Sequence, residues 1–140
     1  VLIDGLAATL AHVGDSRAYR MRDGQLERLT RDHSWVEEQI RVGVLSESAA
    51  RQHPWRNIVT RALSGTEELE VDTQEVQLKP GDRLLLCSDG VFTVLNDDQI
   101  SDVLGRDGDL NALCQALIQG ANDGGGPDNV TAVVLEVDAG

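Results

Sequence analysis

Short apolar runs alternate with tight turns over the first thirty residues. The apolar positions fall in four runs, 1–3, 6–13, 16–21 and 25–29. Asp4-Gly5 separates the first two runs, and Asp23-Gly24 separates the last two. Aspartate–glycine pairs favour the positive φ angles of two-residue hairpin turns. We therefore predict two β-hairpins in this part of the chain.

Residues 31–64 break this pattern. Ser34 followed by Glu37 forms a capping-box pattern, which predicts a helix that runs to about residue 42. Ser46 is predicted to cap a second, shorter helix. Large aliphatic residues are few in this stretch, so we expect an insertion on the surface of the fold and not a core element.

Strand and helix patterns return after Gly65. The predicted elements are, in order, a strand region over 69–78, a buried strand over 84–87, a helix capped by Asn96, a helix that Asp109 caps and that Gly120 and Gly124 to Gly126 end, and a strand over 130–137. The second of these helices has apolar residues at the i, i+3, i+4, i+7 spacing that buries one face. Hairpins followed by helices favour an α+β fold with antiparallel sheets.

Length and composition indicate one aliphatic globular domain. The chain has 140 residues, of which 41% are hydrophobic and 3% aromatic. No apolar run approaches the ~20 residues of a membrane-spanning helix, so we expect no membrane segment. Cys87 and Cys114 lie in apolar patterns without metal-ligand spacing, which is typical of buried free thiols in a reducing, cytoplasmic compartment. Val1 begins inside an apolar run, so we expect further sequence upstream.

Acidic residues concentrate in the second half of the chain. The net charge is −12, which argues against binding to nucleic acid or to an anionic membrane surface. Residues 1–61 carry nine basic and eight acidic residues, whereas residues 62–140 carry three basic and sixteen acidic ones. The acidic half serves either solubility alone or, in part, the binding of metal ions.

Three aspartates stand at predicted strand ends. Asp15 follows the second apolar run, Asp89 follows the buried strand, and Asp128 precedes the last strand. In an antiparallel sheet the end of one strand lies beside the start of its neighbour, so the three carboxylates can meet at one edge. Carboxylates without histidine or cysteine suit hard cations such as Mg²⁺, Mn²⁺ or Ca²⁺. The alternative is that each is a turn aspartate that bonds its own backbone.

Local motifs around these aspartates resemble a known family. Gly14-Asp15-Ser16-Arg17, Ser88-Asp89-Gly90 and Gly126-Pro127-Asp128-Asn129 follow one another in the order found in metal-dependent protein phosphatases of type 2C. Three further motifs are similar to bacterial members: Leu29-Thr30-Arg31-Asp32-His33-Ser34, Thr60-Arg61-Ala62-Leu63 with Gly65, and Leu78-Lys79-Pro80-Gly81-Asp82-Arg83. The resemblance covers about residues 6–137.

The resemblance implies a fold and a domain organisation. The expected fold is α+β, a four-layer α/β/β/α sandwich of antiparallel sheets, incomplete in this chain. Residues 1–140 are then the C-terminal part of a single phosphatase domain, with a surface flap at about 31–64 beside the metal site.

The resemblance also implies a chemistry. Asp89 and Asp128 match the aspartates that hold one ion of a binuclear Mg²⁺ or Mn²⁺ centre, and Asp15 matches the aspartate of a third, weaker ion. In that mechanism a metal-activated water attacks the phosphorus of phosphoserine or phosphothreonine, and no side chain acts as the nucleophile. The expected partners are phosphoprotein substrates of serine/threonine kinases.

Two departures from the family pattern bear on this expectation. The family's first half supplies a bridging Asp-Gly pair, an acidic ligand of the second ion and, in several members, an arginine that binds phosphate. That half is absent here, and the Asp-Gly pairs of this chain fit turns: Asp4-Gly5, Asp23-Gly24 and Asp107-Gly108. Thr93 stands where many relatives have an acidic residue or asparagine, and a hydroxyl is a poorer ligand for a third ion. If this chain is the whole molecule, we expect it to hold at most half of the binuclear centre.

Two other functions stay open. One is a catalytically incomplete domain of the same ancestry that binds a phosphoprotein or a regulatory partner through the flap. The other is an acidic Ca²⁺- or Mg²⁺-binding module unrelated to phosphatases.

Several other side chains are assigned structural roles. Arg17 is expected to pair with the neighbouring Asp15, although it could reach a phosphate. The three histidines lack the spacing of a zinc site, and His33 is expected to shape the start of the flap helix. Trp35 and Trp55 are expected to anchor the flap on the sheet, with a peptide-docking surface as the alternative.

Overall fold

The computed structural model describes residues 1–63, 65 and 69–138, so residue 64 of the predicted flap lies outside the described residues. Its elements are β1 (Leu2–Asp4), β2 (Ala7–His12), β3 (Arg17–Arg22), β4 (Gln25–Arg28), α1 (Trp35–Arg41), α2 (Glu47–Arg51), β5 (Asp72–Gln77), β6 (Arg83–Cys87), α3 (Asp89–Phe92), α4 (Asp97–Leu104), α5 (Leu110–Asp123) and β7 (Ala132–Glu136). Both predicted hairpins are confirmed, because β1 pairs with β2 and β3 pairs with β4 in antiparallel register.

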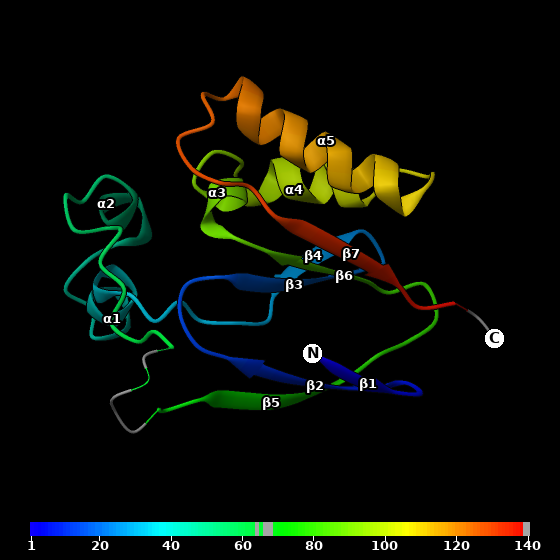
Figure 1. Cartoon of the computed structure of the whole chain (residues 1–140), viewed down its shortest axis with the longest axis horizontal. Helices are drawn as coiled ribbons and strands as arrows, with labels where there is room; N and C mark the ends of the chain where they lie inside the picture. The colour runs from blue at the N-terminus through cyan, green and yellow to red at the C-terminus, as the bar shows by residue number, and fades with distance from the viewer. Residues whose placement is uncertain (64, 66–68, 139–140) are drawn as a thin grey trace.

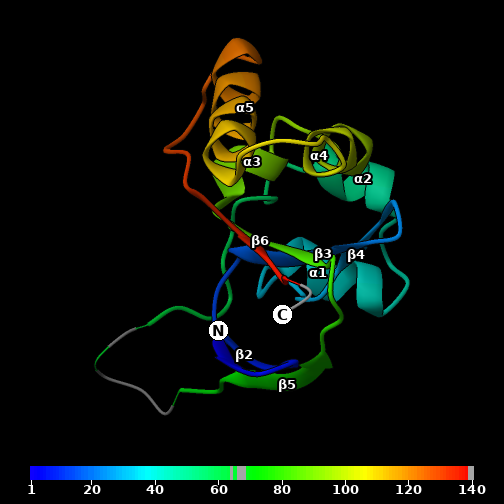
Figure 2. The ribbon, with the colours of Figure 1, turned by 90° about the vertical axis from the view of Figure 1, so that its right-hand side faces the viewer.

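Two antiparallel sheets and one layer of helices make up the described fold (Figure 1). One sheet has the strand order β1-β2-β5, and the other has the order β4-β3-β6-β7. The helices α3, α4 and α5 cover the face of the four-stranded sheet that points away from the three-stranded sheet (Figure 1 and Figure 2). The described residues therefore form three of the four layers of the predicted sandwich, and the predicted antiparallel α+β class is confirmed.

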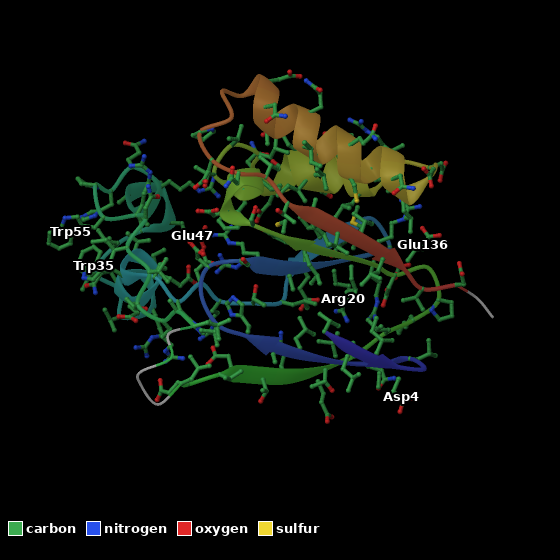
Figure 3. All side chains as sticks on the ribbon, viewed as in Figure 1. Asp4, Arg20, Trp35, Glu47, Trp55 and Glu136 are labelled. Atoms are coloured by element: carbon green, nitrogen blue, oxygen red, sulfur yellow. The ribbon has the colours of Figure 1, made fainter. Side chains whose placement is uncertain are left out.

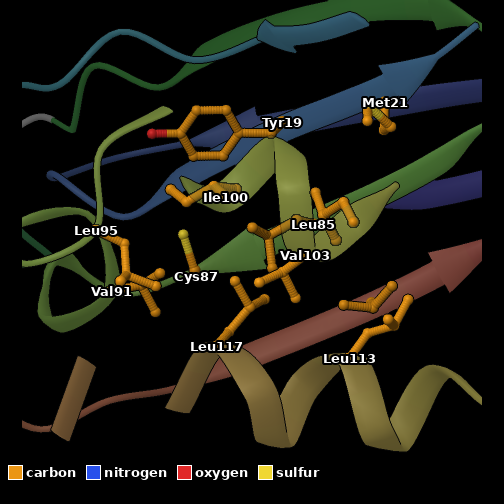
Figure 4. Packing of buried hydrophobic residues seen from close by; sticks show 12 residues of the cluster. Tyr19, Met21, Leu85, Cys87, Val91, Leu95, Ile100, Val103, Leu113 and Leu117 are labelled. Carbon is orange, nitrogen blue, oxygen red and sulfur yellow. The ribbon is translucent and has the colours of Figure 1, made fainter. Parts of the chain in front are cut away.

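Alternation along β3 and β6 divides the core in two. Tyr19 and Leu85 point to the helices, and their cluster includes Ile100 of α4 (Figure 4). The adjacent residues Ala18 and Leu84 face the three-stranded sheet in a second cluster. Because side chains alternate between the two faces of a strand, a slip of one residue would exchange these two sets. Packing on both faces therefore fixes the register of the central strands.

Three of the four predicted N-terminal caps form a side-chain hydrogen bond, whereas Asp109 stands at the N-cap position of α5 without one. The side chains of Ser34, Ser46 and Asn96 each accept a hydrogen bond from the backbone N–H three residues further on. Each bond satisfies one of the N–H groups that the first turn of a helix leaves without a backbone partner. None of the helices in the described ranges combines the length and the apolar character needed to cross a membrane.

Two helical features differ from the prediction. α5 continues past Gly120, the first of the glycines expected to end it, and stops at Asp123, directly before Gly124. A Cβ at Gly120 would lie 3.2 Å from the side chain of Leu95, so glycine allows a close contact inside the helix. The sequence does not predict α3, because its four residues follow β6 directly and are too few to show helical periodicity.

The described part of the predicted flap, residues 31–63, lies at one end of the two sheets and carries α1 and α2 (Figure 1). A bridge between Ser34 and Val59 closes its base. The rings of Trp35 and Trp55 pack edge to face, with centroids 4.9 Å apart, at the outer end of this 31–63 segment (Figure 3). The expectation that they anchor the segment on the sheet is therefore wrong, because they pack on each other within the segment.

A buried carboxylate ties the start of β6 to β3. Asp82 is 1% exposed and accepts hydrogen bonds from Nε of Arg22 at 2.7 Å and from its Nη2 at 2.6 Å. The backbone N–H of Lys79 donates a third bond, at 2.8 Å. The hydrogen bonds from Arg22 are the main reason that the pKa of Asp82 is lowered. The charged form of Asp82 therefore stabilises the folded state.

We expect Asp82→Asn to lower the free energy of unfolding at neutral pH. Because the folded-state pKa lies below the unfolded value of 3.8, the contribution is present above pH 3.8 and is lost as the pH falls through the folded-state pKa. The difference between the native chain and the variant should therefore shrink below pH 3.8. Urea unfolding over a pH series measures this difference. Asp102→Asn, at an exposed position of α4, is the control, and an equal loss of stability there contradicts the prediction.

Candidate metal centre

Strand pairing brings the three predicted aspartates to one end of the four-stranded sheet. Arg17, the first residue of β3, pairs with Cys87, the last residue of β6. Asp15 and Asp89 lie two residues outside this pair. β7 begins beside the same cysteine, four residues after Asp128. The β2–β3 turn, the start of α3 and the segment before β7 therefore share one end of the fold, as predicted (Figure 1).

Two contacts hold the start of α3 against the segment before β7. A Cβ on Gly90 would lie 2.2 Å from the backbone oxygen of Asn129, so the absence of a side chain permits this approach. The hydroxyl of Ser88 donates to the same oxygen at 3.2 Å and accepts from the N–H of Thr131 at 3.0 Å. These contacts explain why the residues on both sides of Asp89 are small.

The electrostatics of Asp89 reflect its two acidic neighbours. Burial raises the pKa of its half-buried carboxyl, and the negative charges of Asp15 and Asp128 raise it further. A divalent cation would offset this repulsion, and carboxylate oxygens are the ligands that hard cations prefer. Within the described part of the chain, however, no three His, Cys, Asp or Glu side chains form a group that could hold an ion. The chain therefore gathers carboxylates of suitable chemistry into part of a site.

The alternative interpretation as turn aspartates applies in part to Asp128. Its Oδ1 accepts a hydrogen bond from the backbone N–H of the next residue, Asn129, at 2.7 Å. That bond lies in the bend before β7. One carboxylate oxygen of Asp128 is thus hydrogen-bonded to the local backbone, and the role of this residue as a metal ligand stays a prediction.

His33 holds the turn that carries Asp15. Its Nδ1 accepts a hydrogen bond from the backbone N–H of Gly14 at 3.1 Å, and its own backbone N–H donates to the carbonyl of Gly14 at 2.8 Å. Because Nδ1 accepts, Nε2 carries the proton and donates to Asp72 at 3.0 Å. The sequence predicts only a role for His33 at the start of the helix. The contact joins residues nineteen positions apart, for which no local sequence signal exists.

Arg17 connects β3 with two neighbouring elements. Its Nε and Nη2 donate to the carboxylate of Asp32 at 2.9 and 2.7 Å, and its Nη1 donates to the hydroxyl of Tyr19 at 3.0 Å. Its guanidinium carbon lies 3.7 Å from the ring centroid of Phe92 on α3. Burial acts to lower the pKa of Arg17, but the hydrogen bond and charge of Asp32 outweigh burial and raise it. The structural ion pair is thus present, but with Asp32 in place of the expected Asp15.

A cavity of about 790 Å³ opens beside Asp15 and Asp89. Thr93, directly after α3, lines it, and residues of α1 and α2 line it from the 31–63 segment. Glu47 is one of these residues, and Figure 3 shows it between that segment and the sheets. The volume falls in the range of ligand pockets, so the carboxylates face a space that can accept part of a larger molecule.

Comparison with known sequences identifies the family. A family model described as stage II sporulation protein E (SpoIIE) matches residues 50–138, more than half of the chain. The serine/threonine phosphatase stp of Listeria monocytogenes is 40% identical over 129 residues, which are 92% of this chain and 51% of that protein. The serine/threonine protein phosphatase PstP of Mycobacterium tuberculosis is 39% identical over 137 residues, which are 98% of this chain and 26% of that protein. The chain belongs to the type 2C family of metal-dependent protein phosphatases and matches the C-terminal portion of their domain.

Solved structures agree with this assignment. The crystal structure of the Mycobacterium tuberculosis serine/threonine phosphatase PstP/Ppp matches with a TM-score of 0.93 at 38% identity, over 98% of this chain and 57% of that one. A structure of the PstP catalytic domain in complex with two manganese ions matches with a TM-score of 0.88 at 37% identity, over 98% and 56%. The chain therefore spans about half the length of these solved relatives.

We expect Gly90→Ala to lower the free energy of unfolding by roughly 1–3 kcal/mol, the usual cost of forcing extra atoms into a packed region. The new methyl group would meet the backbone oxygen of Asn129, which cannot move as freely as a side chain. Gly65→Ala is the matched control, because a Cβ there meets none of the described residues within 4 Å. Urea unfolding compares the two variants, and equal stabilities contradict the close approach of α3 to the segment before β7.

Proposed function

We propose that this chain is the metal-binding C-terminal portion of a domain that hydrolyses phosphoserine and phosphothreonine in proteins with the help of Mg²⁺ or Mn²⁺. One observation carries the proposal: Asp15, Asp89 and Asp128 share one end of the sheet in a chain similar to named serine/threonine phosphatases. A relative's structure that contains two manganese ions supports the choice of metal.

Each carboxylate has a proposed role. Asp89 and Asp128 hold one ion of a two-ion centre, and Asp15 helps to hold a third, weaker one. Such ions, when bound, lower the pKa of a water molecule and stabilise the charge that develops on the phosphoryl oxygens. The chain itself orients the ligands: the contact at Gly90 sets the approach of α3 to β7, and His33 holds the turn before β3.

The proposed substrates are phosphoproteins made by serine/threonine kinases. The 31–63 segment, our proposed flap, lines the cavity beside the carboxylates and can contact the protein around the phosphorylated residue. Arg17 is fully engaged by Asp32 and the Phe92 ring, so we assign it to positioning and not to phosphate binding.

A second function has one observation in its favour. Within the described residues, no three His, Cys, Asp or Glu side chains form a group that could hold an ion. A phosphatase-like domain that binds a phosphoprotein or a regulatory partner without turnover does not need a complete centre. The experiments below separate the two functions.

We expect this chain to bind Mn²⁺ and Asp89→Asn to weaken that binding on the order of tenfold or more, because the variant removes a charged ligand. Isothermal titration calorimetry measures the dissociation constants. Asp102→Asn is the control, since it removes one exposed negative charge away from the site. Equal affinities of the native chain and Asp89→Asn contradict the proposed ligand.

Hydrolysis of p-nitrophenyl phosphate distinguishes the two functions. Turnover that requires Mn²⁺ and disappears in Asp89→Asn supports the enzyme. Binding of Mn²⁺ without turnover favours a phosphatase-like binding domain for this chain, and the catalytic proposal then applies only to a longer protein that includes the remaining ligands.

A further inference from the structure

The cavity beside the carboxylates has a basic wall. Arg51 at the end of α2 and Arg56 beyond it line the cavity from the 31–63 segment, and both are exposed. Glu47, one turn before Arg51 on the same helix, also lines the cavity. In the part of the chain that the structure describes, neither arginine forms an ion pair with Glu47 or with another carboxylate.

The other arginines of the cavity are already paired. Arg17 and Arg28 each bond to a carboxylate of the 31–63 segment, at 2.7 and 2.8 Å. Arg56 makes one long hydrogen bond, 3.4 Å, to the carbonyl of His53. Most donors of Arg51 and Arg56 are therefore available to a ligand in the cavity.

We propose that Arg51 and Arg56 bind acidic side chains that flank the phosphorylated residue of the substrate. The inference rests on the proposed function, because it takes the phosphate to lie at the carboxylate end of the cavity. An extended peptide advances about 3.3 Å per residue, so the neighbours of that residue pass along the cavity walls. A guanidinium group offers carboxylates a planar pair of donors, whereas the acidic Asp97 of α4, which lines the same cavity, repels acidic side chains.

The overall charge of the chain opposes this preference. A net charge of −12 attracts basic peptides and repels acidic ones over long range. A preference for acidic flanks therefore requires a local basic surface. Among the described residues of the cavity, Arg51 and Arg56 provide that surface, because Arg17 and Arg28 are neutralised by their partners.

The test compares fluorescein-labelled phosphothreonine peptides of equal length with acidic, neutral or basic flanks. Fluorescence anisotropy with the native chain and Mn²⁺ gives the dissociation constants. We expect the acidic peptide to bind about threefold to tenfold more tightly than the neutral one, the gain that two exposed ion pairs provide. The double variant Arg51→Ala/Arg56→Ala should lose this gain, and Arg41→Ala, an exposed arginine of α1 outside the cavity, should keep it. Circular dichroism checks that each variant is folded.

Failure of the inference and failure of the proposed function give different results. Equal binding of the three phosphopeptides, or no binding of any, overturns the role of the two arginines. If the three peptides bind equally, and their binding depends on the phosphate and requires Mn²⁺, the role of the two arginines is overturned but the proposed function stands. The acidic peptide can bind more tightly because of Arg51 and Arg56 and yet need neither the phosphate nor Asp89. That result supports the role of the two arginines and contradicts the proposed metal-dependent phosphatase. A preference that survives in the double variant also overturns the inference.

Discussion

The antiparallel pairing of β6 with both of its neighbours is the constraint on which the rest of the structure depends. Cys87, the last residue of β6, stands opposite the first residue of β3 on one side and the first residue of β7 on the other. The loops that carry Asp15 and Asp128 therefore reach the same end as α3. Core packing on both faces of the sheet maintains this register, since a slip of one residue would move Tyr19 and Leu85 to the opposite face of the sheet. The geometry of the site is thus a consequence of the core.

The carboxylates at the site repel one another, and this repulsion opposes the packing that brings them together. Partial burial and two neighbouring carboxylates raise the pKa of Asp89, which means that its charged form is held at a cost. Contacts that involve no charge keep the segments together in spite of that repulsion: the backbone contact at Gly90 and the two hydrogen bonds of Ser88. A structure that gathers acidic groups and holds them by neutral contacts is suited to a cation, because the cation removes the repulsion without disturbing the frame.

Features with a local signal could be predicted from the sequence, and features that depend on distant contacts could not. The hairpins and the helix caps follow from turn and capping residues within four positions of one another. Gly124 directly follows the last residue of α5, as predicted, whereas Gly120 lies inside the helix, where the close approach of Leu95 favours glycine. The partner of Arg17 was wrong, since fifteen residues separate it from Asp32. Family motifs and strand ends located the aspartates, but nothing local indicated that His33 holds the turn that carries Asp15.

The segment that carries the basic wall and the turn that carries Asp15 are joined through one side chain. His33, at the base of the 31–63 segment, bonds the turn through Nδ1 and Asp72 of β5 through Nε2. Arg61, just after Thr60, reaches the same Asp72 at 3.1 Å, so both ends of the segment meet on one carboxylate. Because one imidazole ring makes both bonds, a displacement of His33 changes the hydrogen bonding of the turn that carries Asp15 as well as that of β5.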